Sequence, residues 1–321
     1  MKHLVVTPKG LYCPLGDFYV DPCVGVDRAI ITHGHSDHAR PGSKHYLCSE
    51  SSMPILATRL GSNHTFQGIK FTEKIKIGEA TVSLHPAGHI LGSAQVRIEH
   101  QDYVTVVSGD YKVTPDPAAE PFELVKCNCF ISETTFGVPA FVWPKEAEVI
   151  EEIKSWWQEN ADKQTTSVIF AYALGKSQRI LSSLCAATIG PIFVHESIKE
   201  FVPIYKKAGI QMPVVEIPNK EKVRAANGSA LIICPQSSQK AGWLDQFKPY
   251  QTALASGWMK VKGAAAKRKV DRGFVLSDHA DWPGLLDTIK GTGAEEILVT
   301  HGYTDVMSQY LSKRGYNARV L

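Results

Sequence analysis

The stretch from Thr32 to His38, which reads Thr-His-Gly-His-Ser-Asp-His, decides how this chain is interpreted. It directly follows the apolar residues 29–31, so it predicts a loop at the end of a strand. From such a loop His33 and His35 can reach one metal ion, while Asp37 and His38 can turn toward a second. Imidazole and carboxylate ligands suit zinc, iron or manganese. Four potential ligands in six residues favour a metal site over an ordinary solvated loop.

Three more potential ligands stand just beyond predicted strands. His89 follows residues 81–85, Asp110 follows residues 104–107, and His301 follows residues 297–300. Gly109, immediately before Asp110, lets the backbone approach a neighbour closely. Loops at one end of a sheet can bring ligands from distant sequence positions to one point. Each of these residues alone is weak evidence, but together with the first stretch they predict one metal centre.

The pattern of predicted elements changes twice along the chain. Residues up to about 135 read mainly as short strands, whereas strand and helix alternate after Trp143, as in a doubly wound α/β unit. The first pattern returns after about Arg272. The simplest interpretation is a host domain interrupted by an insertion, with residues 1–140 and 272–321 forming the host and residues 141–271 the inserted domain.

Composition is that of an ordinary globular protein. Of 321 residues, 44% are hydrophobic and 21% are charged, and a net charge of +3 does not by itself identify a nucleic-acid binder. No apolar run has the length of a membrane span, and Pro8 and Lys9 interrupt the start before any signal-peptide core. The seven cysteines contain no C-x-x-C pair, which argues against a zinc–thiolate site and a disulfide framework. We therefore expect a reducing cytoplasm and no membrane association.

The H-x-H-x-D-H stretch, with the later His89, Asp110 and His301, resembles the metallo-β-lactamase superfamily. The resemblance implies an α/β fold, the αββα sandwich, and two divalent metal ions. Zinc is the expected metal, and manganese and iron are the alternatives. It places one ion on His33, His35 and His89, the second on Asp37, His38 and His301, and Asp110 between the two. Asp37 is also expected to take part in catalysis, and Asp21 to support the ligands from behind. Flavodiiron proteins are similar but carry Glu at the position of His35, which disfavours an oxygen-reducing di-iron centre.

Two further residues resemble the β-CASP branch of that superfamily, the nucleases that include RNase J and Artemis. Glu133 lies in Ile-Ser-Glu-Thr-Thr-Phe-Gly at the end of the first half of the host, and His279 lies in Leu-Ser-Asp-His-Ala-Asp-Trp near the start of the second. In that branch a cap domain is inserted between two such residues. The resemblance implies that His279 protonates the departing oxygen, or stabilises its charge, and that Glu133 orients the ring.

Two segments of the inserted domain are candidates for nucleic-acid contact. The segment Tyr-Ala-Leu-Gly-Lys-Ser-Gln-Arg, residues 172–179, is similar to a segment of β-CASP caps, and it would offer a helix N-terminus, Lys176 and Arg179 to phosphate. An ordinary turn between strand and helix explains its spacing equally well. The second segment is a basic run beside an aromatic residue, suited to a phosphate backbone and a stacked base: Trp258, Lys260, Lys262, Lys267, Arg268, Lys269 and Arg272.

The stretch Ser-Gly-Trp-Met at residues 256–259, the basic run and the stretch Asp-Arg-Gly-Phe-Val-Leu-Ser-Asp-His-Ala-Asp-Trp at residues 271–282 resemble bacterial DNA ligase-associated exonucleases, and length and motif order match that family across essentially the whole chain. This resemblance implies a DNA exonuclease in DNA repair, working with an ATP-dependent DNA ligase and a helicase. An RNA-processing nuclease of the RNase J type is the alternative, because the eukaryotic DNA-specific members lack a histidine where His301 stands. A thioester hydrolase on the same host fold would leave the insertion, the basic run and His279 unexplained. The sequence leaves open the polarity, exo- or endonuclease preference, strandedness, metal and oligomeric state.

Overall fold

The computed structural model describes residues 3–61, 64–240 and 242–321, which form two compact units. Unit 1 comprises residues 1–142 and 279–321, and unit 2 comprises residues 143–278. The divisions therefore fall at 142/143 and 278/279, whereas the sequence predicted 140/141 and 271/272. Residues Arg272–Phe274, expected in the host, instead form an edge strand of the sheet of unit 2. Among the described residues no helix is long and apolar enough to cross a membrane.

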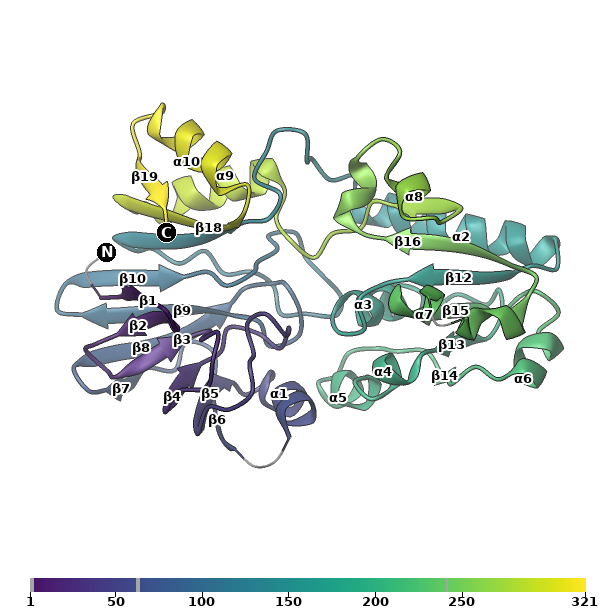
Figure 1. Ribbon diagram of the computed structural model, residues 1–321, viewed down its shortest axis with the longest axis horizontal. Helices are drawn as coiled ribbons and strands as arrows, with labels where there is room; N and C mark the ends of the chain where they lie inside the picture. Colours follow the sequence, from purple (N-terminus) through teal and green to yellow (C-terminus); the bar gives the residue numbers. More distant parts are fainter. Residues whose placement is uncertain (1–2, 62–63, 241) are drawn as a thin grey trace. The chain divides into compact units, whose positions relative to one another are not determined.

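Unit 1 contains two sheets (Figure 1). The six-stranded sheet has its strands in chain order: β1 (Val5–Thr7), β2 (Gly10–Cys13), β3 (Phe18–Val20), β4 (Arg28–Ile30), β5 (His45–Ser49) and β6 (Thr65–Ile69). The seven-stranded sheet has the order β19 (Asn317–Val320), β18 (Glu296–Gly302), β11 (Cys129–Thr134), β10 (Tyr103–Val107), β9 (Ala94–His100), β8 (Ala80–Pro86) and β7 (Ile75–Ile77).

The core of unit 1 lies between these sheets. Phe18 and Ile30 of the first sheet pack in one buried cluster with Val96 and Ile131 of the second. The outer face of the seven-stranded sheet is covered by α9 (Trp282–Thr292) and α10 (Thr304–Ser312), which lie beside β18 in Figure 1. The outer face of the six-stranded sheet carries a smaller cluster that includes Leu56 of α1 (Met53–Leu60). Both sheets therefore bury side chains on their two faces.

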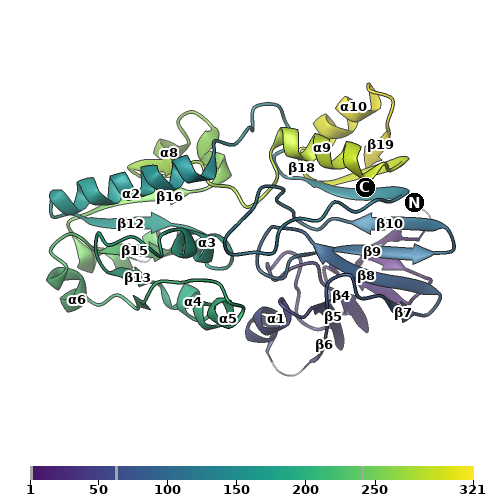
Figure 2. The ribbon, with the colours of Figure 1, turned by 180° about the vertical axis from the view of Figure 1, so that it is seen from behind.

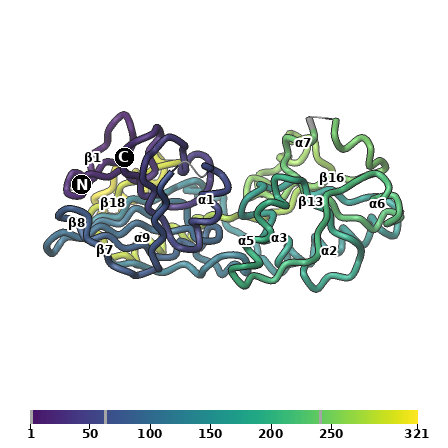
Figure 3. Tube along the Cα trace, turned by 90° about the horizontal axis from the view of Figure 1, so that it is seen from below, coloured from purple at the N-terminus to yellow at the C-terminus, as the bar shows by residue number. Residues whose placement is uncertain are grey.

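Unit 2 is built on one sheet in which all the paired strands run parallel: β14 (Val215–Glu216), β13 (Ile192–Val194), β15 (Leu231–Cys234), β12 (Thr166–Phe170), β16 (Tyr250–Ala255) and β17 (Arg272–Phe274). Its helical segments are α2 (Glu146–Asp162), α3 (Lys176–Ser183), α4 (Glu196–Lys199), α5 (Val202–Lys207), α6 (Lys220–Ala225), α7 (Ser237–Lys240), η1 (Trp243–Phe247), η2 (Gly257–Lys260) and α8 (Ala264–Lys267). Helices α2 and α7 lie on opposite faces of the sheet (Figure 3), and Figure 2 shows α2 next to β12. The expected doubly wound pattern matches this arrangement, because buried apolar strands need cover on both faces.

Candidate metal centre

The candidate ligands of unit 1 gather at one edge of the seven-stranded sheet. β10, β11 and β18 run parallel to one another, and β8 shares their direction because both β8 and β10 are antiparallel to β9. The carboxyl ends of these four strands therefore share an edge, from which they supply His89, Asp110, Glu133 and His301. The loop after β4 joins the same edge, since the amide of Ala94 donates to the carbonyl of Thr32 at 2.8 Å. Strand direction alone thus collects residues from four stretches of sequence.

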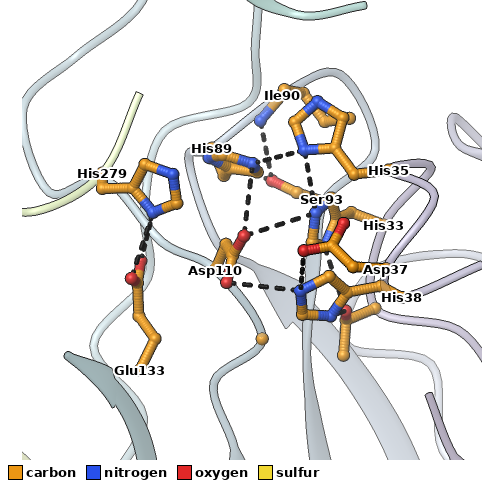
Figure 4. A network of polar contacts seen from close by, with 12 residues as sticks. His33, His35, Asp37, His38, His89, Ile90, Ser93, Asp110, Glu133 and His279 are labelled. Atoms are coloured by element: carbon orange, nitrogen blue, oxygen red, sulfur yellow. Dashed lines mark hydrogen bonds and ion pairs between the residues drawn. The ribbon is translucent and has the colours of Figure 1, made fainter. Parts of the chain in front are cut away.

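Three imidazoles and one carboxylate converge there (Figure 4). Nδ1 of His35 lies 3.1 Å from Nε2 of His33 and 3.0 Å from Nε2 of His89. Oδ2 of Asp110 lies 3.6 Å from Nε2 of His33 and 3.8 Å from Nε2 of His89. One ligand atom from each of the four residues lies within 4.8 Å of the other three. Three ring nitrogens facing one point beside a carboxylate are the donor set that a zinc-like cation takes.

His38 faces the same carboxylate from a second side. Its Nε2 is buried, makes no hydrogen bond to any described residue, and lies 3.4 Å from Oδ1 of Asp110. Its other nitrogen, Nδ1, lies 2.7 Å from Oδ2 of Asp21. A buried polar atom without a hydrogen bond is costly, and a carboxylate behind a histidine is the usual support for a metal ligand. The surroundings of His38 therefore fit a cation bound at Nε2.

Asp37 and His301, which are expected to bind the second cation together with His38, lie farther from the other candidate ligands. Asp37 and His301 line a cavity of about 140 Å³ together with Asp21 and His38. The rings of His301 and His38 stack with centroids 5.3 Å apart, and Oδ2 of Asp37 lies 3.8 Å from Nε2 of His38. However, neither Asp37 nor His301 belongs to a close group of potential ligand atoms among the described residues. The structure brings all seven predicted ligands to one region, but only the first set converges tightly.

Burial and neighbouring charge fix the protonation states of the centre. Burial and the charge of His38 hold the pKa of His33 well below its ordinary value, so His33 is neutral. Burial would raise the pKa of Asp110, but the positive charge of His38 outweighs burial and holds this pKa well below its usual range. Burial likewise lowers the pKa of His38, and the carboxylates of Asp110 and Asp21 outweigh it, so that this pKa lies well above the ordinary value. A cation replacing the His38 proton would meet two carboxylates already in place.

Glu133 and His279 form a hydrogen-bonded pair beside this cluster (Figure 4). Nδ1 of His279 lies 2.9 and 3.0 Å from the two carboxylate oxygens of Glu133. Glu133 is buried and also accepts from the amides of Tyr111 and Thr135. The rings of His279 and His89 have centroids 4.7 Å apart. Glu133 therefore engages Nδ1 of His279 and holds this imidazole next to the ring of His89.

Two residues that the sequence analysis did not select hold the centre in place. Thr32 donates its amide and its hydroxyl to Asp21 at 2.8 and 2.6 Å, and its hydroxyl lies 3.1 Å from Nδ1 of His33. Ser93 accepts from the amide of His89 at 3.0 Å. Thr32 stands directly before the first histidine of the stretch, which could have marked it. Nothing near Ser93 in the sequence signals its role.

The backbone around the centre also requires particular residues. Gly109 has φ of +57°, and a Cβ at this position would lie 2.7 Å from Cβ of Thr32. The prediction that the backbone approaches a neighbour here is therefore confirmed. Asp21 and His301 also have positive φ, +44° and +54°. Such conformations are unfavourable for non-glycine residues and gather at functional sites.

Lys176 and Arg179 lie elsewhere than expected. Both are buried in unit 2, where Nζ of Lys176 lies 2.9 Å from Oδ2 of Asp278 and Nη1 of Arg179 lies 3.1 Å from Oδ1. Arg179 also pairs with Glu146 and donates to the carbonyl of Ser277. Because Lys176 and Arg179 are buried and already pair with carboxylates of the protein, the structure argues against the phosphate contact expected for them. Sequence spacing could not distinguish an internal ion pair from a phosphate site.

The basic run is arranged differently. Five of its cations are exposed, and none of the five pairs with an acidic side chain in the described part of the chain: Lys260, Lys262, Lys267, Arg268 and Lys269. Trp258 is also exposed, whereas Arg272 is partly buried, 3.9 Å from Glu152. These five cations, unlike Lys176 and Arg179, remain available to a polyanion.

Sequence comparison finds relatives with names from nucleic-acid metabolism. The chain is 32% identical over 312 residues, 96% of its length, to the "Probable DNA ligase" of Opitutus terrae, of which it covers 30%. It is 29% identical over 122 residues, 37% of its length, to "RNase aCSPSF2" of Saccharolobus solfataricus, covering 24% of that protein. It is 23% identical over 231 residues, 60% of its length, to "Transcription termination factor FttA" of Methanothermobacter thermautotrophicus, covering 35% of it. The chain thus spans about a quarter to a third of the length of these relatives.

No family model matches the chain. A similar solved structure is a crystal structure of a protein of unknown function from Enterococcus faecalis V583. It superposes with a TM-score of 0.63 over 91% of this chain and 78% of that one, at 13% sequence identity. At this identity the likeness establishes a shared fold and says nothing of activity.

Proposed function

We propose that this chain is a metal-dependent nuclease of the β-CASP branch of the metallo-β-lactamase fold, with unit 1 as the αββα sandwich and unit 2 as the inserted cap. The observation that carries the proposal is the convergence of His33, His35, His89 and Asp110 beside the Glu133–His279 pair. Unit 2 lies in the chain between Glu133 and His279, as a β-CASP cap would. The relatives named as an RNase and a DNA ligase support the same branch.

Two divalent cations would divide the ligands between them, with His33, His35 and His89 on one, Asp37, His38 and His301 on the other, and Asp110 shared. Zinc suits these donors best, and manganese or iron is compatible with them. When bound, such cations supply Lewis-acid stabilisation of phosphoryl oxygens and lower the pKa of water. The chain itself holds the ligands in place, since Asp21 fixes the Nδ1 side of His38 and Thr32 fixes Asp21.

His279 would act on the oxygen that leaves the phosphorus. With Nδ1 held by Glu133, its Nε2 can donate a proton to that oxygen or stabilise its charge. The buried carboxylate of Glu133 fixes the ring orientation. The mutual geometry of the two residues and their place next to His89 support these proposed roles.

DNA is the proposed substrate, and an exonuclease acting in repair is the proposed activity. A protein named as a DNA ligase contains a segment similar to 96% of this chain, whereas the RNase relative matches only 37%. In that relative, the segment similar to this chain and a much longer remainder belong to one polypeptide. This arrangement supports association of the present chain with a DNA ligase. RNA remains the second candidate, because His301 stands where RNA-processing members keep a histidine.

The test is a cleavage assay on the purified chain. Labelled single- and double-stranded DNA and RNA, each with and without a 5′ phosphate, are incubated with Mn²⁺ or Zn²⁺ and with EDTA. We expect metal-dependent release of nucleotides from DNA ends. Cleavage of RNA alone would transfer the proposal to RNA processing. Metal uptake without cleavage of any of these substrates would refute the nuclease assignment, and turnover of a thioester by the same preparation would assign the centre to small-molecule hydrolysis.

A further inference from the structure

Unit 2 contains a cavity that the metal centre does not explain. Its volume is about 430 Å³, a size typical of small-ligand sites. The polar and aromatic residues that line it follow strands β12, β15 and β16 or lie at the end of α8. They are Tyr172, Gln236, Ser237, Ser256, Trp258 and Arg268. Every one of them belongs to unit 2, so the cavity is defined within that unit alone.

The cavity lies where the topology of the sheet favours binding. Tyr172 follows β12 and Trp258 follows β16, and these two strands are parallel neighbours. The chain leaving β12 proceeds to β13, toward the edge that ends in β14, whereas the chain leaving β16 proceeds to β17 at the opposite edge. Outgoing connections that diverge leave a crevice beyond the carboxyl ends of the strands, where open α/β sheets bind ligands.

The residues that line the cavity suit a ligand in which a flat ring lies next to an anionic group. Tyr172 is 66% exposed and Trp258 is 37% exposed, so both rings present surface to solvent beside the apolar wall formed by Ala171 and Leu254. Nζ of Lys176 lies 5.8 Å from the centroid of the Tyr172 ring. Gln236 and Ser237 offer donors and acceptors at the rim. Arg268 adds a cation that pairs with no acidic side chain in the part of unit 2 that the structure describes. Stacking surfaces beside a cation are how proteins hold single-stranded nucleic acid.

We propose that this cavity, the Tyr172–Trp258 pocket, binds one unpaired nucleobase of the substrate strand. The base contacts the rings of both Tyr172 and Trp258, and the adjoining phosphate lies on Arg268. The inference rests on the proposed nuclease function and narrows its substrate, because a base inside a duplex cannot enter the pocket. A strand with an unpaired end is therefore preferred to a blunt duplex.

Binding of the full-length chain in EDTA tests this, because neither metal nor turnover is involved. The probes are a fluorescein-labelled oligodeoxythymidylate and an oligomer of the same length and phosphate number without bases. Tyr172→Ala and Trp258→Ala should each weaken binding of the oligothymidylate by roughly 5- to 150-fold, the range for losing one stacked base. Binding of the abasic oligomer should stay unchanged, Tyr172→Phe and Trp258→Phe should keep wild-type affinity, and Arg268→Ala should weaken both probes.

Lys220→Ala, which removes an exposed cation of α6 outside the basic run, is the matched control for Arg268→Ala. Equal binding of both probes by the wild type would overturn the pocket, as would alanine variants that bind the oligothymidylate normally. Either result combined with metal-dependent cleavage would leave the nuclease proposal standing. Base-dependent binding without cleavage in any metal would leave the pocket standing and remove the nuclease.

Discussion

Nδ1 of His279 lies 2.9 Å from Oε1 of Glu133, although 146 residues separate the two in the chain. The whole of unit 2 is inserted between them. The contact is local to unit 1, since β11 delivers Glu133 and the first residue after unit 2 is His279 itself. A histidine oriented by a buried carboxylate beside three other imidazoles is a reactive arrangement, and it supplies the first prediction.

His279→Ala should lower kcat for DNA cleavage by about 10²- to 10⁴-fold, the usual contribution of a positioned acid or base. Metal content should stay near that of the wild type, because His279 is not one of the seven proposed ligands. His279 does form a second close group of potential ligand atoms with Asp110 and Glu133, so a loss of metal in the variant would instead make it a ligand. Rates and metal content measured on the same preparation check both statements. Glu133→Gln keeps an oxygen acceptor without the charge and should cost less than His279→Ala. Unchanged kcat in His279→Ala would remove the residue from the mechanism.

His33→Ala should abolish both activity and stabilisation by zinc. At free zinc 100 times its Kd, a one-site metal adds about 2.7 kcal/mol to the free energy of unfolding, and this gain should be absent in the variant. Thermal melts with and without zinc measure it, and His45→Ala, which changes an exposed histidine, is the control. Because His33 is fully buried, the metal-free melt is needed to separate loss of metal from loss of fold. An unchanged zinc shift would contradict the assignment of His33 as a ligand.

Asp21→Asn should weaken metal binding while leaving every proposed ligand present. The change removes the carboxylate that holds Nδ1 of His38 at 2.7 Å, and removing a partner of this kind typically costs about 10- to 100-fold in affinity. Competition with a chromophoric chelator gives the affinity. Asp27→Asn, in an exposed pair with Lys44, is the matched control and should bind as the wild type does. Equal affinities for the two variants would show that Asp21 has no supporting role.

Arg179→Ala should destabilise the fold rather than weaken DNA binding directly. The change removes the contacts of Arg179 with Glu146 and Asp278, and breaking a buried pair costs about 3–5 kcal/mol. Chemical denaturation gives the difference, and Lys145→Ala, in an exposed pair with Glu148, should cost less than about 1 kcal/mol. A variant of normal stability that binds DNA poorly would restore the phosphate contact predicted from the sequence.

Replacing Lys267, Arg268 and Lys269 together by Ala should weaken DNA binding and leave stability nearly unchanged, the reverse of the result expected for Arg179→Ala. Stability should be nearly unchanged, because all three side chains are exposed. Affinity for single-stranded DNA should fall, and the slope of log K against log salt should decrease in magnitude by about 0.7 for each phosphate that the variant no longer binds. The control with equal charge change replaces Lys206, Lys207 and Lys220, exposed on the same unit. Equal slopes in the two triple variants would exclude the basic run from the binding surface.

The local sequence was sufficient where chemistry and strand pattern coincide. Residues 32–38 place several ligand types in a loop after an apolar strand, and the remaining ligands follow the same rule, so their gathering at one sheet edge could be anticipated. The alternation of strand and helix after residue 143 likewise indicated an inserted α/β unit. The C-terminal boundary expected for this unit differs from the structure because β17 pairs with β16. A strand of only three residues does not indicate from its own sequence which sheet it joins.

Only the tertiary structure decided which charged groups face inward and how tightly each ligand set closes. Lys176 and Lys267 are chemically alike, yet one is buried against Asp278 and the other is exposed. The hydrogen bonds from Thr32 to Asp21 and from His89 to Ser93 depend on loops that take their positions only in the folded chain. The sequence by itself determined the ligand types and their order, because these are local. Burial, pairing and the Tyr172–Trp258 pocket are relations between distant segments, and the packing of the sheets alone sets them.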